Sequence, residues 1–516
     1  MTARAESGPK IDAVAARESA GPGRRVALRA AALTGATALG AVALGQRSAL
    51  ASPATPANEA ASASGTSLVV TDPLTANTCV LPSGDTTGNT DTPNINNALA
   101  ANLSGQNVVL AAGVFYVNSP IIIPPGGVLR GQFANENTEL SVHAWGSCIS
   151  AVGTWEPVSV PGGAVNAVVA CIGQEAGGYS VSGDETKIYG VMIDCLQVPR
   201  TLVSPITNGQ ISVDGLQIFG KISRAHLERV LIAHPSGCGF NMVNDSFGLG
   251  PDAVHLERVN VRYPGDVGFK HIKISDSTYY DCLCENGAAD GFYIQNGSNS
   301  VWTACRSEHN AGNGYTYMSS STSTGSGVAR LVGCSSDRNE AHGIYITSSD
   351  GLGLPVVLSA CAFRRDGRQD QAGGGVFAGI AISSYPGPVQ ISGCTVWPGV
   401  DDDGTGTPSP NYGLILATNA PRSQVVVAAS YLQGAGTFLN DDGTTPDVRW
   451  GPDVAGAHGP SSNPTLRAPR TGEGKLSGGS ATISSNCVNA NSIIQLTQGF
   501  VIHCRHQAAQ EINDRG

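Results

Sequence analysis

Residues 278–318 read TYYDCLCENGAADGFYIQNGSNSVWTACRSEHNAGNGYTYM, and this stretch contains one pattern twice. A short run with apolar residues ends at Cys282 and again at Cys305, while Gly291 and Gly314 each precede a large aromatic residue. The two copies are 23 residues apart at both positions. Two fixed positions in each copy indicate a repeated structural unit.

The same two positions recur along much of the chain. The cysteine position is occupied by Cys282, Cys305, Cys334, Cys361 and Cys394, and earlier by Val230 and Val259. The glycine position is occupied by Gly215, Gly239, Gly268, Gly291, Gly314, Gly343, Gly379 and Gly413. The repeat length varies between 23 and 36 residues. Such variation is typical of a solenoid whose strands keep their register while its loops change in length.

The composition favours strands over helices in each unit. The units contain no ten-residue run with helical periodicity, and the chain has 66 Gly and 29 Pro among 516 residues. We therefore predict an all-β fold, a solenoid of parallel strands. Equivalent residues of successive coils then stack about 4.8 Å apart. The five cysteines would form an inward ladder of free thiols rather than disulfides.

The charge balance excludes some classes of partner. The chain has 30 basic and 40 acidic residues, a net charge of −10, which is too acidic for a general nucleic-acid binder. An anionic ligand would need a local cluster of basic residues. Beyond the first 51 residues no stretch is apolar for 18 residues, so we expect no membrane association after the leader is removed.

The first 51 residues have the features of an export signal. Arg24-Arg25 precede an apolar run from Ala30 to Gly45, and Ala49-Leu50-Ala51 offers small residues at a cleavage site. This pattern predicts a secreted protein that is exported by the twin-arginine pathway. An uncleaved membrane anchor is the alternative, although the apolar run is shorter than the roughly 20 residues that a span needs.

The front of the solenoid carries a more specific pattern. Residues 94–101 have helical periodicity and follow Pro93, and such a short helix can cover the open apolar end of a solenoid. The segments VVLAAGVFYV (108–117), IIIPPG (121–126) and LRG (129–131) follow. Together they resemble the entry segment of the pectin-lyase-like right-handed parallel β-helix superfamily. The later coils resemble its glycoside hydrolase family 28-related and pectate-lyase-3-like members, which are secreted and phage-tail-like proteins.

The resemblance implies a domain organisation. It covers about residues 80–435, and residues 465–496 resemble a small β-module that is appended to such helices. We predict the export signal at 1–51, a disordered linker at 52–79, the β-helix at 80–440, a second linker at 441–464, the C-terminal β-module at 465–498 and a tail at 499–516. By analogy with elongated β-helices, the protein could form a homotrimer.

Polar residues stack just beyond the cysteine ladder. Three positions after successive cysteines lie Glu285, Glu308, Asp337 and then Arg364. Adjacent coils place such carboxyl groups about 5 Å apart, and alternate coils place them roughly 10 Å apart, which brackets the separations found in glycosidases. Repulsion between like charges favours protonation of one member, and Glu308, in the middle, is our candidate general acid. The predicted catalytic residues are therefore Glu308, Glu285 and Asp337.

Neighbouring positions supply candidate substrate-binding residues. Arg338, Arg364 and Arg365 could bind the carboxylate of a uronate, or stabilise the developing charge in a lyase reaction. The other predicted binding residues are His309, His342 and Trp302, and Tyr317 and Trp397 are further aromatic candidates for sugar stacking. The alternative reading is structural: Asn286, Asn310 and Asn339 would form a ladder bonded to the backbone, and the charged residues would be surface ion pairs.

A metal site is a weaker possibility. The loop Asp401-Asp402-Asp403-Gly404 could bind Ca²⁺ through oxygen ligands such as Asp401 and Asp403, or it could be a solvated turn without any cofactor. The family 28 aspartate motifs are absent in their order, and only Glu340-Ala341-His342-Gly343 is similar to the family's histidine segment.

The sequence leaves more than one function open. The first hypothesis is a secreted glycoside hydrolase or polysaccharide lyase that acts on an acidic or plant or microbial polysaccharide. The alternative is a non-catalytic carbohydrate-binding or tail-fibre-like surface protein, and a purely structural scaffold is a third. The superfamily contains all of these, so the fold alone does not select one.

Overall fold

The computed structural model describes most of residues 69–450, together with two short antiparallel strands near the C-terminus, β37 (His503–Arg505) and β38 (Glu511–Asn513). Within 69–450 the description leaves out 73–76, 103–105, 133–145, 174–184, 198–211, 245, 247, 249, 321–326, 370–375, 403, 418–423 and 442–446. The predicted export signal and C-terminal module lie outside the described residues. In the described part, no helix is long and apolar enough to cross a membrane.

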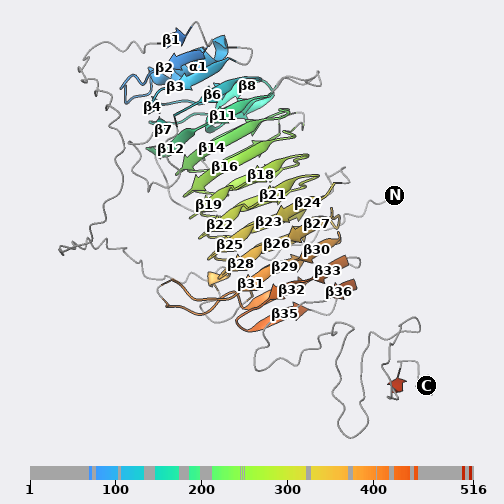
Figure 1. The fold of residues 1–516 in the computed structure, drawn as a ribbon. Helices are drawn as coiled ribbons and strands as arrows, with labels where there is room; N and C mark the ends of the chain where they lie inside the picture. Colours follow the sequence, from blue (N-terminus) through green and yellow to red (C-terminus); the bar gives the residue numbers. More distant parts are fainter. Residues whose placement is uncertain are drawn as a thin grey trace, which may run out of the picture. The chain divides into compact units, whose positions relative to one another are not determined.

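The described chain winds into a parallel β-helix whose coils stack in sequence order (Figure 1). Each complete coil contributes a strand to three faces, which we call face 1, face 2 and face 3. Faces 1 and 2 belong to one continuous sheet because β14 (His226–Ala233) and β16 (His255–Arg262) run across both. Face 3 is a separate sheet. This confirms the predicted all-β fold, a right-handed parallel β-helix.

Face 1 contains the first strand of each coil. Besides the first halves of β14 and β16, its strands are β2 (Asn77–Val80), β3 (Asn107–Leu110), β6 (Val128–Arg130), β11 (Lys187–Tyr189), β18 (Thr278–Tyr280), β21 (Val301–Thr303), β24 (Ala329–Val332), β27 (Val356–Ser359), β30 (Val389–Ser392), β33 (Gln424–Ala428) and β36 (Asp447–Trp450).

Face 2 contains the second strand of each coil. Besides the second halves of β14 and β16, its strands are β4 (Gly113–Val117), β7 (Ser147–Val152), β12 (Val191–Gln197), β19 (Leu283–Glu285), β22 (Arg306–Glu308), β25 (Ser335–Asp337), β28 (Ala362–Arg364), β31 (Thr395–Trp397) and β34 (Tyr431–Leu432).

Face 3 contains the third strand of each coil, and from β13 to β32 each strand starts at or next to a register glycine. Its strands are β5 (Ile121–Ile123), β10 (Ala167–Ile172), β13 (Asp214–Phe219), β15 (Phe240–Val243), β17 (Phe269–Ile272), β20 (Phe292–Gln295), β23 (Tyr315–Ser319), β26 (Ile344–Ser348), β29 (Ala378–Ser383), β32 (Tyr412–Ala417) and β35 (Thr437–Asp441). A hairpin of β8 (Val158–Val160) and β9 (Gly163–Val165) lies between β7 and β10 in the chain.

The bend between faces 1 and 2 explains the cysteine ladder. A single residue with positive φ makes this bend, for example Asp281 (φ 50°) and Ala304 (φ 54°), and the next residue turns inward. The ladder cysteines occupy that inward position, and all five are buried and free. The predicted ladder of inward thiols is therefore confirmed. Val230 and Val259 occupy the same place on earlier coils, as the strand register shows.

The N-terminal helix α1 (Asp91–Ala101) packs on the first coils, next to β4 and β5. The helix residues Ile95 and Leu99 are buried against the core. The Asp91 carboxylate accepts hydrogen bonds from the backbone N–H groups of Ser83 (2.9 Å) and Tyr116 (3.0 Å). The helix thus covers the end of the core as predicted.

Strands occupy part of both predicted linkers. β1 (Val69–Asp72) lies inside the predicted linker 52–79 and pairs antiparallel with β2, which begins inside it at Asn77. Likewise β36 pairs in register with β33, so regular strand pairing continues to Trp450. Each boundary was misplaced for the same reason: a single short strand carries too little periodicity to be distinguished from a linker, and only pairing with its neighbour reveals it.

Candidate functional site

The predicted carboxylates form one outward column on face 2. Strand pairing places Glu285 beside Glu308, Glu308 beside Asp337, and Asp337 beside Arg364. The column continues to Arg262 on one side and Trp397 on the other. We call these residues the face 2 column: Arg262, Glu285, Glu308, Asp337, Arg364 and Trp397. The stacking inferred from the repeat is therefore confirmed, and their catalytic role stays a prediction.

Each carboxylate of the column forms an ion pair with an arginine. Arg262 Nε lies 3.1 Å from Glu285, Arg306 Nη1 lies 3.9 Å from Glu308, and Arg364 Nη2 lies 3.1 Å from Asp337. The unbalanced repulsion expected from three stacked carboxylates is thereby offset. The sequence analysis missed Arg262 and Arg306. Arg262 could have been found by extending the column one coil toward the N-terminus, and Arg306 because it lies two residues before Glu308 in the same strand.

Asp337 is the most enclosed carboxylate of the column, with an exposed fraction of 4%. It accepts hydrogen bonds from Arg364 and from two nitrogens of Arg365, one of them at 2.8 Å, and Arg338 Nε lies 3.6 Å away. Its oxygens are occupied by guanidinium donors. Asp337 therefore anchors the arginines in place, and it has no free oxygen facing a substrate.

The aspartate loop after Trp397 folds back onto these arginines. Asp402 accepts hydrogen bonds from Arg338 and Arg365, both at 2.5 Å, and these two contacts hold the pKa of the Asp402 carboxyl below its ordinary value. Asp401 accepts one from Arg368 at 2.9 Å. A calcium ion at Asp401 would therefore have to displace Arg368. Asp403, the other predicted ligand, lies outside the described residues.

The structural ladder proposed as the alternative also exists, with one different member. Asn310 Nδ2 donates to Asn339 Oδ1 (2.9 Å), and Asn339 Nδ2 donates to Asp366 Oδ1 (2.8 Å). All three side chains are buried. Asn286 is instead the bend residue before this position, with φ 58°. The ladder stabilises the turns between faces 2 and 3, next to Arg338, Arg364 and Arg365, which we call the arginine cluster.

The two predicted histidines occupy different places. His309 is a bend residue (φ 56°) between faces 2 and 3. Its pKa is lowered, mainly because the ring is partly buried and secondly because the positive charge of Arg338 is nearby. His342 lies at the start of face 3, where its Nδ1 accepts the backbone N–H of Ala378 at 3.0 Å. Burial lowers the pKa of His342 to about 4. This nitrogen of His342 links two coils and is not free to bind a sugar.

Trp302 is not a substrate-binding residue. Its side chain is fully buried and stacks on Tyr279 inside the core, with ring centroids 4.9 Å apart, and Tyr317 is buried as well. The prediction was wrong because Trp302 is the middle residue of β21, whose side chain points inward. Of the three aromatic candidates, Trp397 is the one on the surface: 54% of it is exposed, and its ring stacks on Tyr431 with the centroids 5.6 Å apart.

Comparisons with known proteins agree with the fold. Residues 208–352 match the family model described as a right handed beta helix region. Among solved structures, the A-module of the mannuronan C-5 epimerase AlgE6 of Azotobacter vinelandii is similar at 14% identity, over 70% of this chain and 94% of that chain, with a TM-score of 0.43. The N-terminal fragment of bacteriophage Phi29 gene product 12 is similar at 14% identity, over 71% and 64%, with a TM-score of 0.46.

A third similar structure is the catalytic domain of a GH87 α-1,3-glucanase in complex with tetrasaccharides, at 11% identity, over 71% of this chain and 65% of that chain, with a TM-score of 0.43. These proteins differ in function, and the similarity concerns the course of the backbone. No activity passes from them to this chain.

Proposed function

We propose that this parallel β-helix is a polysaccharide-active protein that binds an acidic polysaccharide along face 2. One observation carries the proposal. Trp397 and Arg364 are neighbours in the face 2 column, and each is 54% exposed. A flat aromatic surface next to an accessible guanidinium matches a sugar ring that bears a carboxylate.

The chemistry of the two side chains is complementary. The ring of Trp397, supported by Tyr431, offers a large apolar surface to the C–H face of a sugar. The guanidinium of Arg364 makes one hydrogen bond to Asp337 and keeps other N–H donors for a carboxylate. In a protein of net charge −10, Arg364 is a local basic group with which a uronate carboxylate can pair.

The column also fits a polymer. Equivalent positions on successive coils are separated by about 4.8 Å. A polysaccharide that runs along the column would therefore pass from Trp397 and Arg364 to the level of Glu308 and Arg306, where both side chains are partly exposed.

The test compares the mature protein and its variants in gels that contain a polyuronate or the same polymer after reduction of its carboxyl groups. We expect retardation by the polyuronate. Arg364→Gln and Trp397→Ala should each weaken binding on the order of tenfold or more, since a central contact is worth about 1–2 kcal/mol or more. The carboxyl-reduced polymer should lose the contribution of Arg364 and keep that of Trp397.

Two residues on face 1 supply matched controls. Arg330 is an exposed arginine of β24, and Tyr280 is an aromatic residue of β18 that is 45% exposed. Arg330→Gln and Tyr280→Ala should leave binding unchanged. Equal loss from the face 1 and face 2 variants, or no retardation by any polyuronate, would contradict the proposal.

Cleavage of the bound polymer is a second candidate function. Glu285 and Glu308 are paired carboxylates on adjacent coils, and their side chains are 20% and 27% exposed. In this hypothesis Glu308 donates a proton to the leaving oxygen. Glu308→Gln should reduce product formation on the order of 10²-fold or more, with little change in stability. New reducing ends and the absorbance of unsaturated uronates would distinguish hydrolysis from β-elimination.

Arg306→Gln is the control for this experiment, because it removes the same ion pair and keeps the carboxyl group. Equal activity of the wild type and Glu308→Gln would exclude Glu308 as the acid. If no polymer is cleaved while binding persists, the protein acts by binding alone.

Export before binding is part of the same proposal. The leader with Arg24-Arg25 would direct a folded protein out of the cell. Eleven cysteines of the described residues are free, and ten of them are buried. Free buried thiols are compatible with folding in the reducing cytosol before export.

A further inference from the structure

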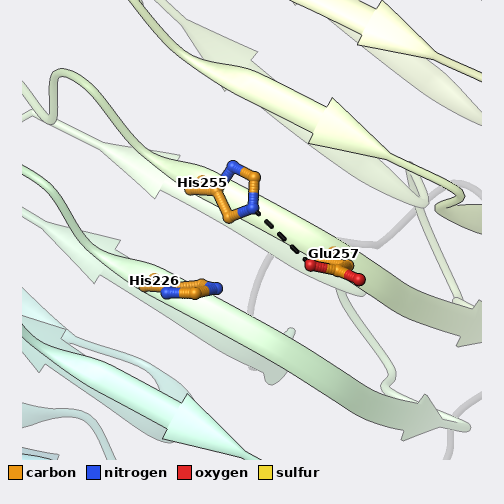
Figure 2. A group of neighbouring side chains, drawn as sticks. All are labelled: His226, His255 and Glu257. Atoms are coloured by element: carbon orange, nitrogen blue, oxygen red, sulfur yellow. Dashed lines mark ion pairs between the residues drawn. The ribbon is translucent and has the colours of Figure 1, made fainter.

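A group of three side chains on face 1 lies apart from the face 2 column. His226, His255 and Glu257 come from the motif HLERV, which occurs identically at 226–230 and 255–259. Parallel pairing of β14 and β16 places His226 beside His255, and Glu257 lies two residues further along β16. Their ligand atoms all lie within 4.8 Å of one another. Figure 2 shows the three side chains on these two neighbouring strands.

We propose that His226, His255 and Glu257 bind one zinc ion and leave a fourth coordination position open. Two imidazoles and one carboxylate are a ligand set that suits zinc. Calcium and magnesium prefer sites made of oxygen atoms alone. This site is independent of the function proposed for face 2, because it uses another face and other residues.

His255 already has the orientation of a metal ligand. Its Nδ1 lies 2.5 Å from the hydroxyl of Thr278 on the next coil, and its Nε2 lies 3.9 Å from Glu257 Oε2. When Nδ1 donates its proton to Thr278, Nε2 presents its lone pair on the side of Glu257. Such an outer hydrogen bond commonly fixes the tautomer of a metal-binding histidine.

His226 supplies an independent observation. Its Nε2 is buried and has no hydrogen-bond partner among the described residues. The His226 ring lies edge-on to the His255 ring, with centroids 4.7 Å apart. In a tetrahedral zinc site, metal–nitrogen bonds of about 2.0–2.1 Å place ligand atoms roughly 3.3 Å apart. The present spacing of up to 4.8 Å is larger, and rotation of the partly exposed side chains of His255 and Glu257 would shorten it. The pairing of β14 with β16 fixes the backbone positions of all three residues.

The surrounding charges leave Glu257 available. Glu228 occupies the equivalent place on β14, but it lies 3.8 Å from Arg229. Lys187, next to His226 in the register, pairs with Glu185 at 2.7 Å. Among the described residues, the ion-pair partner of Glu257 is His255. A cation at the cluster would therefore meet a carboxylate that forms no ion pair with an arginine or lysine of the described residues.

A pocket lies close to His226, and none of the three proposed ligands lines it. It has a volume of about 410 Å³, and Arg130, Tyr189 and Glu228 are among its lining residues. The ring of Tyr189 lies 5.5 Å from that of His226. Water or a small anion is the class of ligand that an open zinc position takes.

The experiment measures Zn²⁺ binding to the mature protein after removal of metals with a chelator. Calorimetric titration should show a saturable site for one Zn²⁺ per chain, and Co²⁺ in its place should give visible absorption bands of a tetrahedral site. His226→Ala, His255→Ala and Glu257→Gln should each weaken binding more than tenfold. Thr278→Val should weaken it about tenfold, because it removes only the outer hydrogen bond.

Glu228→Gln is the matched control, since Glu228 holds the same position on the adjacent coil. It should bind Zn²⁺ as the wild type does, and circular dichroism should show that all variants are folded. The proposal is wrong if the wild type has no saturable site, or if the three ligand variants bind Zn²⁺ as tightly as the wild type.

Discussion

Asp366 is a carboxyl group in a position where a neutral side chain would suffice. It ends the buried ladder of Asn310 and Asn339, and it accepts hydrogen bonds from Ser336 Oγ (2.5 Å) and from the side chain and backbone of Asn339. Burial raises its pKa from 3.8 to about 7. The folded state therefore binds this proton more tightly than the unfolded chain, and the contribution to stability falls as pH rises from about 4 to 7.

Asp366→Asn should remove this pH dependence. The wild type should lose about 2–3 kcal/mol at this site between pH 5 and pH 8, because one pKa unit corresponds to about 1.4 kcal/mol. The asparagine continues the ladder without a charge, so the variant should be the more stable protein at pH 8. Denaturant unfolding of both proteins at the two pH values measures the difference. A variant that is less stable than the wild type at pH 8 would show that the ionised carboxylate is favourable there.

The residue scale also shows where sequence reasoning succeeds and fails. Glu285, Glu308 and Asp337 were placed correctly because they lie a constant three residues after a repeated cysteine. Trp302 was misplaced because the bend at Ala304, with φ 54°, interrupts the alternation of the strand. Trp302 and Cys305 therefore both point inward although they are three residues apart. Strict alternation would have put them on opposite sides.

At the scale of strands and bends, the cysteine ladder is a packing device. Each thiol follows a bend between faces 1 and 2, where little space is available, and a small apolar side chain fits. Burial raises the pKa of the Cys305 and Cys334 thiols well above the ordinary value. Since the thiolate is the reactive form, these cysteines should be inert in the folded protein.

A polar thiol reagent should therefore leave Cys282, Cys305, Cys334, Cys361 and Cys394 unlabelled until the protein is unfolded. Cys79, which is partly exposed, is the internal control and should react in the native protein. Peptide mapping by mass spectrometry after labelling with and without denaturant measures both. Rapid native labelling of the ladder would contradict its inward position.

The loop at 398–410 could not have been predicted from the repeat. Its contacts, Asp402 with Arg338 and Arg365 and Asp401 with Arg368, join residues 33 to 64 positions apart. The register specifies which strands pair, but it carries no information on the direction of an inserted loop. The neutralisation of the arginine cluster therefore became visible only in three dimensions.

At the scale of the whole molecule, the repeat determined most of the architecture. Parallel pairing of equivalent positions follows from the two registers over about residues 214–441. The three-sided cross-section did not follow from them, because the division of each coil into faces depends on bends at single residues. The function of the surface depends on that division, since it separates the face 2 column from the histidine cluster on face 1.

We propose that the leader directs the protein out of the cell by the twin-arginine pathway. Replacing both Arg24 and Arg25 by Lys should block export and leave a folded precursor in the cell, because the twin arginines are read by a receptor. Cell fractionation and immunoblotting measure the distribution of the wild type and the variant. Unchanged secretion of the double variant would show that another pathway exports the protein.

A crystal structure of the mature protein with a bound uronate oligosaccharide would show whether face 2 recognises an acidic polysaccharide, as we propose. We expect a sugar ring stacked on Trp397, with its carboxylate hydrogen-bonded to Arg364, and further sugars along the column toward Glu308. An oligosaccharide bound on face 1 or face 3, with Trp397 and Arg364 untouched, would contradict it.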